Sequence, residues 1–84
     1  MTRFYLHLHN RIGFVRDYEG TELPDLESAT RLAIDSIRDV LSEEVRAGHM
    51  DLRGHIDIVD DVQTILAVIS FSSAIELHLA KGNS

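Results

Sequence analysis

The chain has 84 residues, of which 44% are apolar and 26% are charged, with one proline and no cysteine. A chain of this length folds as one small domain, and packing alone must stabilise it because no disulfide can form. The net charge of −6 is spread along the chain and excludes non-specific binding of nucleic acid, since phosphate backbones would repel such a surface.

A first hairpin is predicted near the start of the chain. In Arg3–His9, apolar and polar side chains alternate, which is typical of a half-buried strand. Asn10–Gly13 contains residues that tolerate the backbone angles of a tight turn, and Phe14–Tyr18 is the expected returning strand. We expect Thr21–Pro24 to be a connector.

A long amphipathic helix follows. Asp25 is placed to cap its start, because a carboxylate can accept hydrogen bonds from the free N–H groups of the first turn. Apolar residues then recur at steps of three and four, which predicts a helix over Leu26–Ala47 with one apolar stripe. Gly48 suits the position after its end, and Glu27 and Arg31 are spaced for an ion pair on the solvent side.

A second hairpin is predicted after the helix. His55–Asp60 alternates, with Ile56 and Ile58 facing inward, Asp61–Gln63 is the turn, and Thr64–Phe71 is the returning strand. This last strand is apolar on both sides. It must therefore be central in the sheet or be covered by something else.

The next segment has two interpretations. Ser73 and Glu76 have the spacing of a capping box, which favours a short helix over Ala74–Ala80. Apolar residues of the same stretch also alternate, so a continued strand is equally compatible with the pattern.

Together these elements predict an α+β fold of two layers, in the order ββαββ, with or without a short C-terminal helix. An antiparallel sheet packs against one long helix, and we expect the first and last strands to be central. The expected core consists of inward-facing apolar residues from every element: Phe4, Leu6, Leu8, Leu26, Ala29, Ala33, Ile37, Val40, Leu41, Ile56, Ile58, Ile65 and Ile69.

The segment Glu-Gly-x-Glu-Leu-Pro-Asp-Leu at residues 19–26, with Ala29 and the start Phe4-Tyr5-x-His7, carries a resemblance. The chain resembles a family of short bacterial proteins, abundant in alphaproteobacteria, that is catalogued as a domain of unknown function. The resemblance covers nearly the whole chain. It implies a fold and a bacterial origin, and no activity or site residues.

A second, partial resemblance is to HicB-type antitoxins, in which a hairpin leads to a Pro-Asp-Leu segment and a helix follows. Those proteins usually place a further strand before the helix, whereas here the predicted helix starts at once. This resemblance implies an antitoxin-like partner of a basic toxin.

A cluster of possible metal ligands lies on the predicted strands. His7 and His9 are two residues apart, so both imidazoles leave the same face of their strand, as metal ligands often do. If the first and third strands are neighbours, His55 and Asp57 would join them, with Asp17 on the second strand. The alternative is that these residues form the solvated face of the sheet. No other cofactor is expected.

Acidic residues also gather around the first turn and the helix start: Asp17, Glu19, Glu22 and Asp25. Paired carboxylates can act as acid and base. Their spacing here fits strand-end, turn and helix-cap positions instead, and no nucleophile triad or phosphate-binding glycine loop accompanies them. We therefore expect a protein that is not an enzyme.

The apolar outward side of the last strand and of the segment after it predicts an interface, because soluble proteins seldom leave such a surface open. The alternative is that a terminal helix covers it. The expected residues of the interface are Leu66, Val68, Ile75, Leu77 and Leu79. We expect a non-enzymatic bacterial interaction or regulatory module that forms a homodimer or binds another protein. The alternatives are a divalent-metal-binding protein and the antitoxin-like module.

Hydropathy predicts a cytoplasmic protein without membrane contact. The first ten residues lack the apolar stretch of a secretory signal. The longest unbroken apolar run, Ile65–Ile69, is far shorter than the ~20 residues that cross a bilayer.

Overall fold

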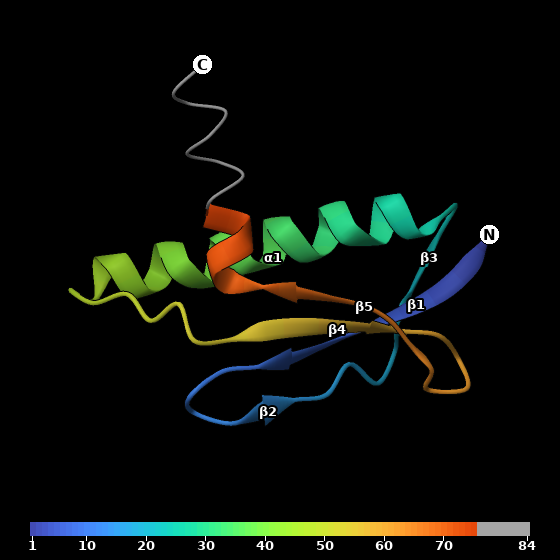
Figure 1. The fold of residues 1–84 in the computed structure, drawn as a ribbon, viewed down its shortest axis with the longest axis horizontal. Coiled ribbons are helices and arrows are strands. Elements are labelled where there is room, and N and C mark those ends of the chain that lie inside the picture. Colours follow the sequence, from blue (N-terminus) through green and yellow to red (C-terminus); the bar gives the residue numbers. More distant parts are fainter. Residues whose placement is uncertain (76–84) are drawn as a thin grey trace, which may run out of the picture.

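The computed structural model describes residues 1–75 and contains one antiparallel sheet and one long helix (Figure 1). Residues 71–75 form a further helical turn at the end of the described chain. The elements in chain order are β1 (Thr2–His9), β2 (Phe14–Val15), β3 (Thr21–Leu23), α1 (Leu26–Arg46), β4 (His55–Val59) and β5 (Ile65–Ser70). The predicted two-layer α+β fold is confirmed.

The sheet has the order β2-β1-β4-β5, and β3 also pairs with β1. β1 and β4 are therefore the central strands, with Tyr5 opposite Val59 and His9 opposite His55. The expectation that the last strand is central is wrong, because β5 pairs only with β4 among the strands of residues 1–75.

The return from β1 differs from the predicted single strand Phe14–Tyr18. The turn after β1 forms as expected, with hydrogen bonds in both directions between the backbones of Asn10 and Gly13. β2 ends at Val15, and after a loop the chain pairs with β1 again as β3, within the segment predicted to be a connector. Asp17 causes the interruption: its side chain takes the hydrogen bond of the Leu6 N–H that a continuous strand would use.

Helix α1 begins and ends close to the predicted residues. The Asp25 side chain accepts a hydrogen bond of 2.9 Å from the Ser28 N–H, which confirms the cap. Ala47 follows the last helical residue, and Gly48 then adopts a positive φ of 93°, a conformation that glycine takes without strain. At about 1.5 Å per residue the helix spans roughly 31 Å as one unbroken rod (Figure 1).

The core lies between α1 and one face of the sheet. Its buried members come from β1, α1, β4 and the end of the described chain: Phe4, Ala29, Ala33, Ile37, Leu41, Ile56, Ile58, Phe71 and Ala74. Leu6, Leu8, Val40 and Ile69 pack against this group as partly buried residues. Most of the predicted core is thus confirmed.

Two predicted core residues lie at the surface. Leu26 is 39% exposed in the first turn of α1, and Ile65 is 58% exposed. Ile65 is displaced by an irregularity in β5: Ile58 faces Ala67 while the next residue, Val59, faces Ile65. Leu66, between Ala67 and Ile65, is therefore an extra residue in β5. It shifts the alternation of side chains between the two faces of the sheet, so Ile65 faces away from the core.

Residues 71–75, which follow β5, form a helical turn and do not continue the strand. The rest of the predicted segment Ala74–Ala80 lies outside the described residues. Ser70, not Ser73, caps the helical turn, since the Ser70 hydroxyl oxygen accepts from the Ser73 N–H at 3.1 Å. Phe71 and Ala74 are buried against the core, which fixes the turn on the α1 side of the sheet (Figure 1). The predicted positions Leu77 and Leu79 lie outside the described residues.

Within residues 1–75, no helix combines the length and the apolar composition needed to cross a membrane.

Candidate functional site

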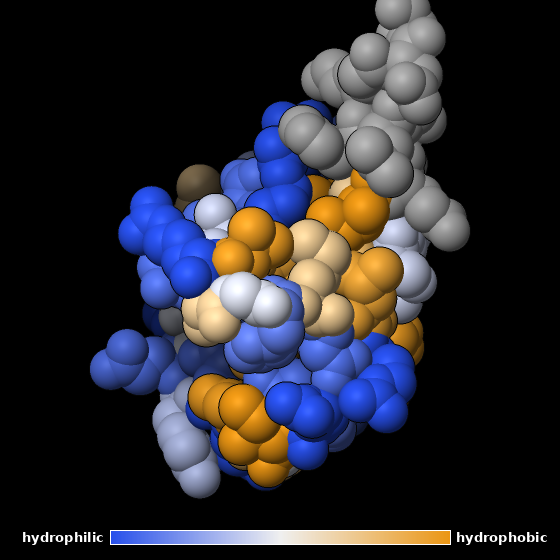
Figure 2. Space-filling model, turned by 90° about the vertical axis from the view of Figure 1, so that its left-hand side faces the viewer, coloured by the Kyte–Doolittle hydropathy of each residue, from blue (hydrophilic) through white to orange (hydrophobic). Residues whose placement is uncertain are grey.

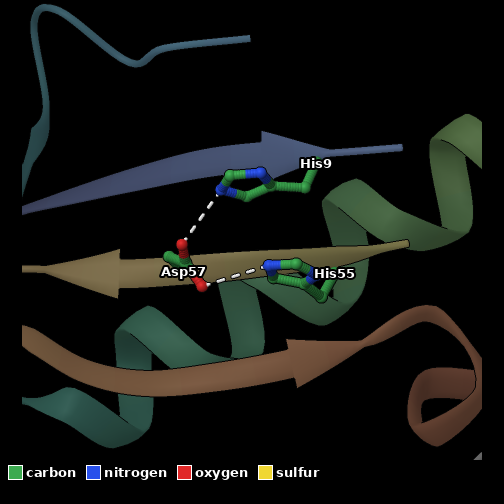
Figure 3. A group of neighbouring side chains, drawn as sticks. All are labelled: His9, His55 and Asp57. Atoms are coloured by element: carbon green, nitrogen blue, oxygen red, sulfur yellow. Dashed lines mark hydrogen bonds and ion pairs between the residues drawn. The ribbon is translucent and has the colours of Figure 1, made fainter. Parts of the chain in front are cut away.

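The candidate site lies on the face of the sheet opposite α1. Ile56 and Ile58 point into the core, so their neighbours His55 and Asp57 point to the other face. His9 lies directly opposite His55 in the β1–β4 pair. Figure 3 shows His9, His55 and Asp57 together in front of the two central strands, with α1 behind them.

The three side chains converge on one carboxylate. His9 Nε2 lies 3.0 Å from Asp57 Oδ2, and His55 Nε2 lies 3.4 Å from Asp57 Oδ1, so each carboxylate oxygen has its own imidazole (Figure 3). One ligand atom from each of the three residues can be chosen so that all lie within 4.8 Å of one another. The Asp57 side chain is 16% exposed, while the two histidines are more open.

Aromatic stacking holds the imidazoles in place. The rings of His9 and His55 are 4.4 Å apart between centroids and within 14° of parallel. Phe14 of β2 packs against the other side of His9 at 4.6 Å. The histidine pair is therefore positioned by contacts from three neighbouring strands.

His7 is not part of this group, although it shares the face. It is 6% exposed, its Nδ1 accepts from the Asp17 N–H at 3.1 Å, and its Nε2 lies 3.2 Å from Gln63 Oε1. Both ring nitrogens are thus engaged in holding two loops against the sheet. Of the four predicted ligands, the structure brings together three.

Asp17 also lies apart from the cluster. Its carboxylate accepts hydrogen bonds from the backbone N–H groups of Leu6, Glu19 and Gly20. This arrangement shapes the loop between β2 and β3. The side chain therefore has a structural partner for each oxygen.

The remaining acidic residues of the first turn and helix start are separated from one another. Glu22 pairs with Arg3 at 3.2 Å, and Asp25 caps α1, where the hydrogen bond from the Ser28 N–H lowers the pKa of its carboxyl. Glu19 is exposed in the loop. These contacts agree with the turn and cap positions expected from the sequence.

A shallow cavity of about 310 Å³ opens beside the histidine pair, lined by His9, Asn10, Arg11, Arg53, Gly54 and His55. Both arginines at its rim contact Asp51, Arg11 at 3.2 Å and Arg53 at 3.0 Å. Hydrogen bonds from Arg53 are the main cause that lowers the pKa of Asp51 to about 2, so this carboxylate is charged at neutral pH. Arg11, Asp51 and Arg53 were not predicted as a group from the sequence. The spacing Asp51-x-Arg53, which allows an ion pair between the two side chains, could have indicated part of it.

Two of the predicted interface residues, Leu66 and Val68, form part of an open surface on β5. Val68 is 56% exposed and Leu66 40%, and the displaced Ile65 adds to them at 58%. Ile75 instead packs against the core as a partly buried residue. The exposed residues of the predicted interface therefore lie on the strand, whereas Ile75 of the helical turn does not contribute to that surface.

A second apolar area lies at the end of α1. Val45 and Met50 are about half exposed, and with Leu41 and Ile75 they contribute to a cavity of about 300 Å³. Figure 2 shows this end of the molecule, where apolar residues gather in separate areas between hydrophilic ones. Its rim contains Arg38 and Arg46.

A comparison with known protein families identifies the family of this chain. A model described as a domain of unknown function, DUF6894, matches residues 3–72. The chain belongs to the DUF6894 family. The matched part includes His9, His55, Asp57 and all of β5, so the histidine–aspartate cluster and the exposed side of β5 lie within the DUF6894 domain. No curated protein and no solved structure matches the chain.

Proposed function

We propose that this DUF6894 protein is a non-enzymatic interaction module of the bacterial cytoplasm that pairs with a second copy of itself through β5. The single observation that carries the proposal is the position of β5 at the sheet edge with exposed apolar side chains. An edge strand offers a row of backbone N–H and C=O groups to which another strand can be added.

The exposed side chains support an edge contact. Val68 lies opposite Asp57 in the β4–β5 pair and points to the face away from α1, and Ile65 is turned out by the irregularity in β5. Natural sheets often protect an open edge with charged residues or proline. β5 has neither between Ile65 and Ser70.

The absence of charge on β5 permits a second copy as the partner. The chain carries a net charge of −6, so two copies repel each other over most of their surfaces. From Val62 to Ile75 the sequence contains no Asp, Glu, Lys or Arg, which is its longest stretch without such a residue. Two β5 strands can therefore pair in antiparallel fashion without placing like charges opposite one another.

The mass of the full chain in solution tests this proposal. Light scattering coupled to size-exclusion chromatography should give twice the chain mass at micromolar concentration. The substitution Val68→Lys should give the mass of one chain, because it places two positive charges near each other in the paired strands. Val45→Lys is the matched control, since Val45 is 53% exposed on α1, and it should leave the dimer intact.

Three results would overturn the proposal. The first is a wild-type mass of one chain across the concentration range. The second is dissociation by Val45→Lys and not by Val68→Lys, which would place the contact at the end of α1. The third is a stable complex only with a small basic protein added to the sample, which would favour the antitoxin-like alternative.

A further inference from the structure

We propose that His9, His55 and Asp57 form a site for one divalent transition-metal ion, of which zinc is the best match. The two imidazoles and one carboxylate are a ligand set typical of zinc sites that keep a fourth position open for water or another ligand. This inference is independent of pairing through β5, because all three ligands come from one chain.

The ligand atoms lie close to the spacing that one ion requires. With metal–ligand bonds of about 2.0–2.2 Å, two ligands of a tetrahedral zinc ion lie about 3.3–3.6 Å apart. The Nε2 atoms of His9 and His55 lie 3.0 and 3.4 Å from Asp57, each from a different carboxylate oxygen, and one ligand atom from each residue lies within 4.8 Å of the other two. Binding of one ion therefore requires side-chain shifts of up to about 1 Å.

The backbone of the site is rigid. His9 and His55 are direct partners in the pairing of the two central strands, and Asp57 follows His55 by two residues on the same face. Both strands have neighbours on either side. Ligands mounted on central strands are held in position better than ligands on loops.

Ring orientation decides what must move. The imidazole planes of His9 and His55 are within 14° of parallel, with centroids 4.4 Å apart, so the in-plane directions in which the two Nε2 atoms can bind a metal do not meet at one point. Coordination of one ion requires each ring to rotate about its bond to Cβ and the stack to open. His9 and His55 side chains are 37% and 38% exposed, which leaves room for this rotation.

The charges around the site are compatible with a cation. Asp57 supplies a negative ligand, and the cations at the rim of the adjacent cavity, Arg11 and Arg53, are both paired with Asp51. The cavity gives space for a water or other ligand at the open position.

Titration of the metal-free full chain with zinc chloride, followed by calorimetry, tests the site. We expect saturable binding of one zinc ion per chain. Asp57→Asn and His55→Gln should each lower the zinc affinity by more than about tenfold. Removal of a residue that only hydrogen-bonds to a metal ligand already lowers metal affinity by about tenfold or more, and these two residues are themselves the proposed ligands. His49→Gln is the matched control, because it removes an exposed histidine outside the cluster, and it should bind zinc as the wild type does.

Histidine ring NMR gives a second readout that does not depend on heat. Zinc should shift the ring signals of His9 and His55 and leave those of His7 unchanged. Absence of saturable binding, or binding that survives both Asp57→Asn and His55→Gln in folded protein, would overturn the proposal. A stoichiometry of one zinc ion per two chains would also overturn it, because the ligands would then come from two copies.

Discussion

The backbone N–H of Asp17 donates a 3.1 Å hydrogen bond to Nδ1 of His7. A backbone N–H can only donate, so Nδ1 must be the unprotonated nitrogen, and Nε2 carries the proton that it donates to Gln63 Oε1 at 3.2 Å. His7 thereby joins the loop after β2 to the turn before β5. His7 is therefore a structural histidine, whereas His9 on the same strand contacts Asp57, Phe14 and His55.

Removal of the Asp17 carboxylate should destabilise the fold. Asp17→Ala leaves the N–H of Leu6 and two loop N–H groups without their acceptor, so we expect a loss of about 1–3 kcal/mol in the free energy of unfolding. Urea denaturation measures this loss. Glu19→Ala, in the same loop but exposed, should change the value by less than about 0.5 kcal/mol. Equal losses in the two variants would contradict the assignment.

Ile37 is the centre of the α1 contact with the sheet. It is fully buried, so Ile37→Ala should cost about 2–5 kcal/mol through lost burial and the cavity left behind. Val45→Ala on the same helix removes a half-exposed side chain and should cost far less. Chemical denaturation of both variants measures these losses. A loss below about 0.5 kcal/mol for Ile37→Ala would contradict the assignment of this face of α1 to the core.

The Asp51–Arg53 pair should give a pH dependence at acid pH. The pKa of Asp51 is lowered from 3.8 to about 2 in the folded chain, mainly by hydrogen bonds from Arg53. The folded state thus favours the charged carboxylate. The stability from this group is present above pH 3.8 and is lost as the pH falls toward about 2.

An NMR titration of the Asp51 carboxyl measures this pKa directly. Arg53→Ala should move it up toward 3.8, and Arg46→Ala, which removes an exposed arginine elsewhere, should not. High salt should weaken the effect because the arginine is exposed. An Asp51 pKa that is unchanged in Arg53→Ala would show that another group lowers it.

Gly54 allows the close approach of two segments beside the candidate metal site. A Cβ atom at this position would lie 2.8 Å from the His9 carbonyl oxygen and 2.8 Å from the Phe71 ring. Gly54→Ala should therefore cost about 1–3 kcal/mol, as overpacking in a core does. Thermal or urea denaturation tests this, and an unchanged midpoint would mean that the backbone shifts without cost.

Several local features follow from the sequence because local physics decides them. Asp25 caps α1 and Gly48 follows its end because both act on the backbone within one turn. The spacing of apolar residues selects the buried face of α1, with Ala29, Ala33, Ile37 and Leu41 inward. The same reasoning placed His9, His55 and Asp57 on one side of their strands.

Other features needed contacts between distant residues. The Asp17 carboxylate interrupts the returning strand because the N–H it binds belongs to Leu6, eleven residues earlier, and no local pattern contains that pairing. The extra residue in β5 arises from register with β4 and exposes Ile65. Alternation within one strand cannot reveal a shift that the neighbouring strand imposes.

The order of amino acids alone predicts the long helix, its buried face and the two central strands, because helix caps and side-chain periodicity act over a few residues. The edge position of β5 among the described strands, the contacts of His7 with two loops, and the meeting of His9 and His55 at Asp57 follow from the fold of the domain. Those outcomes depend on strand order and register, which are set by the packing of the whole domain and not by any one segment.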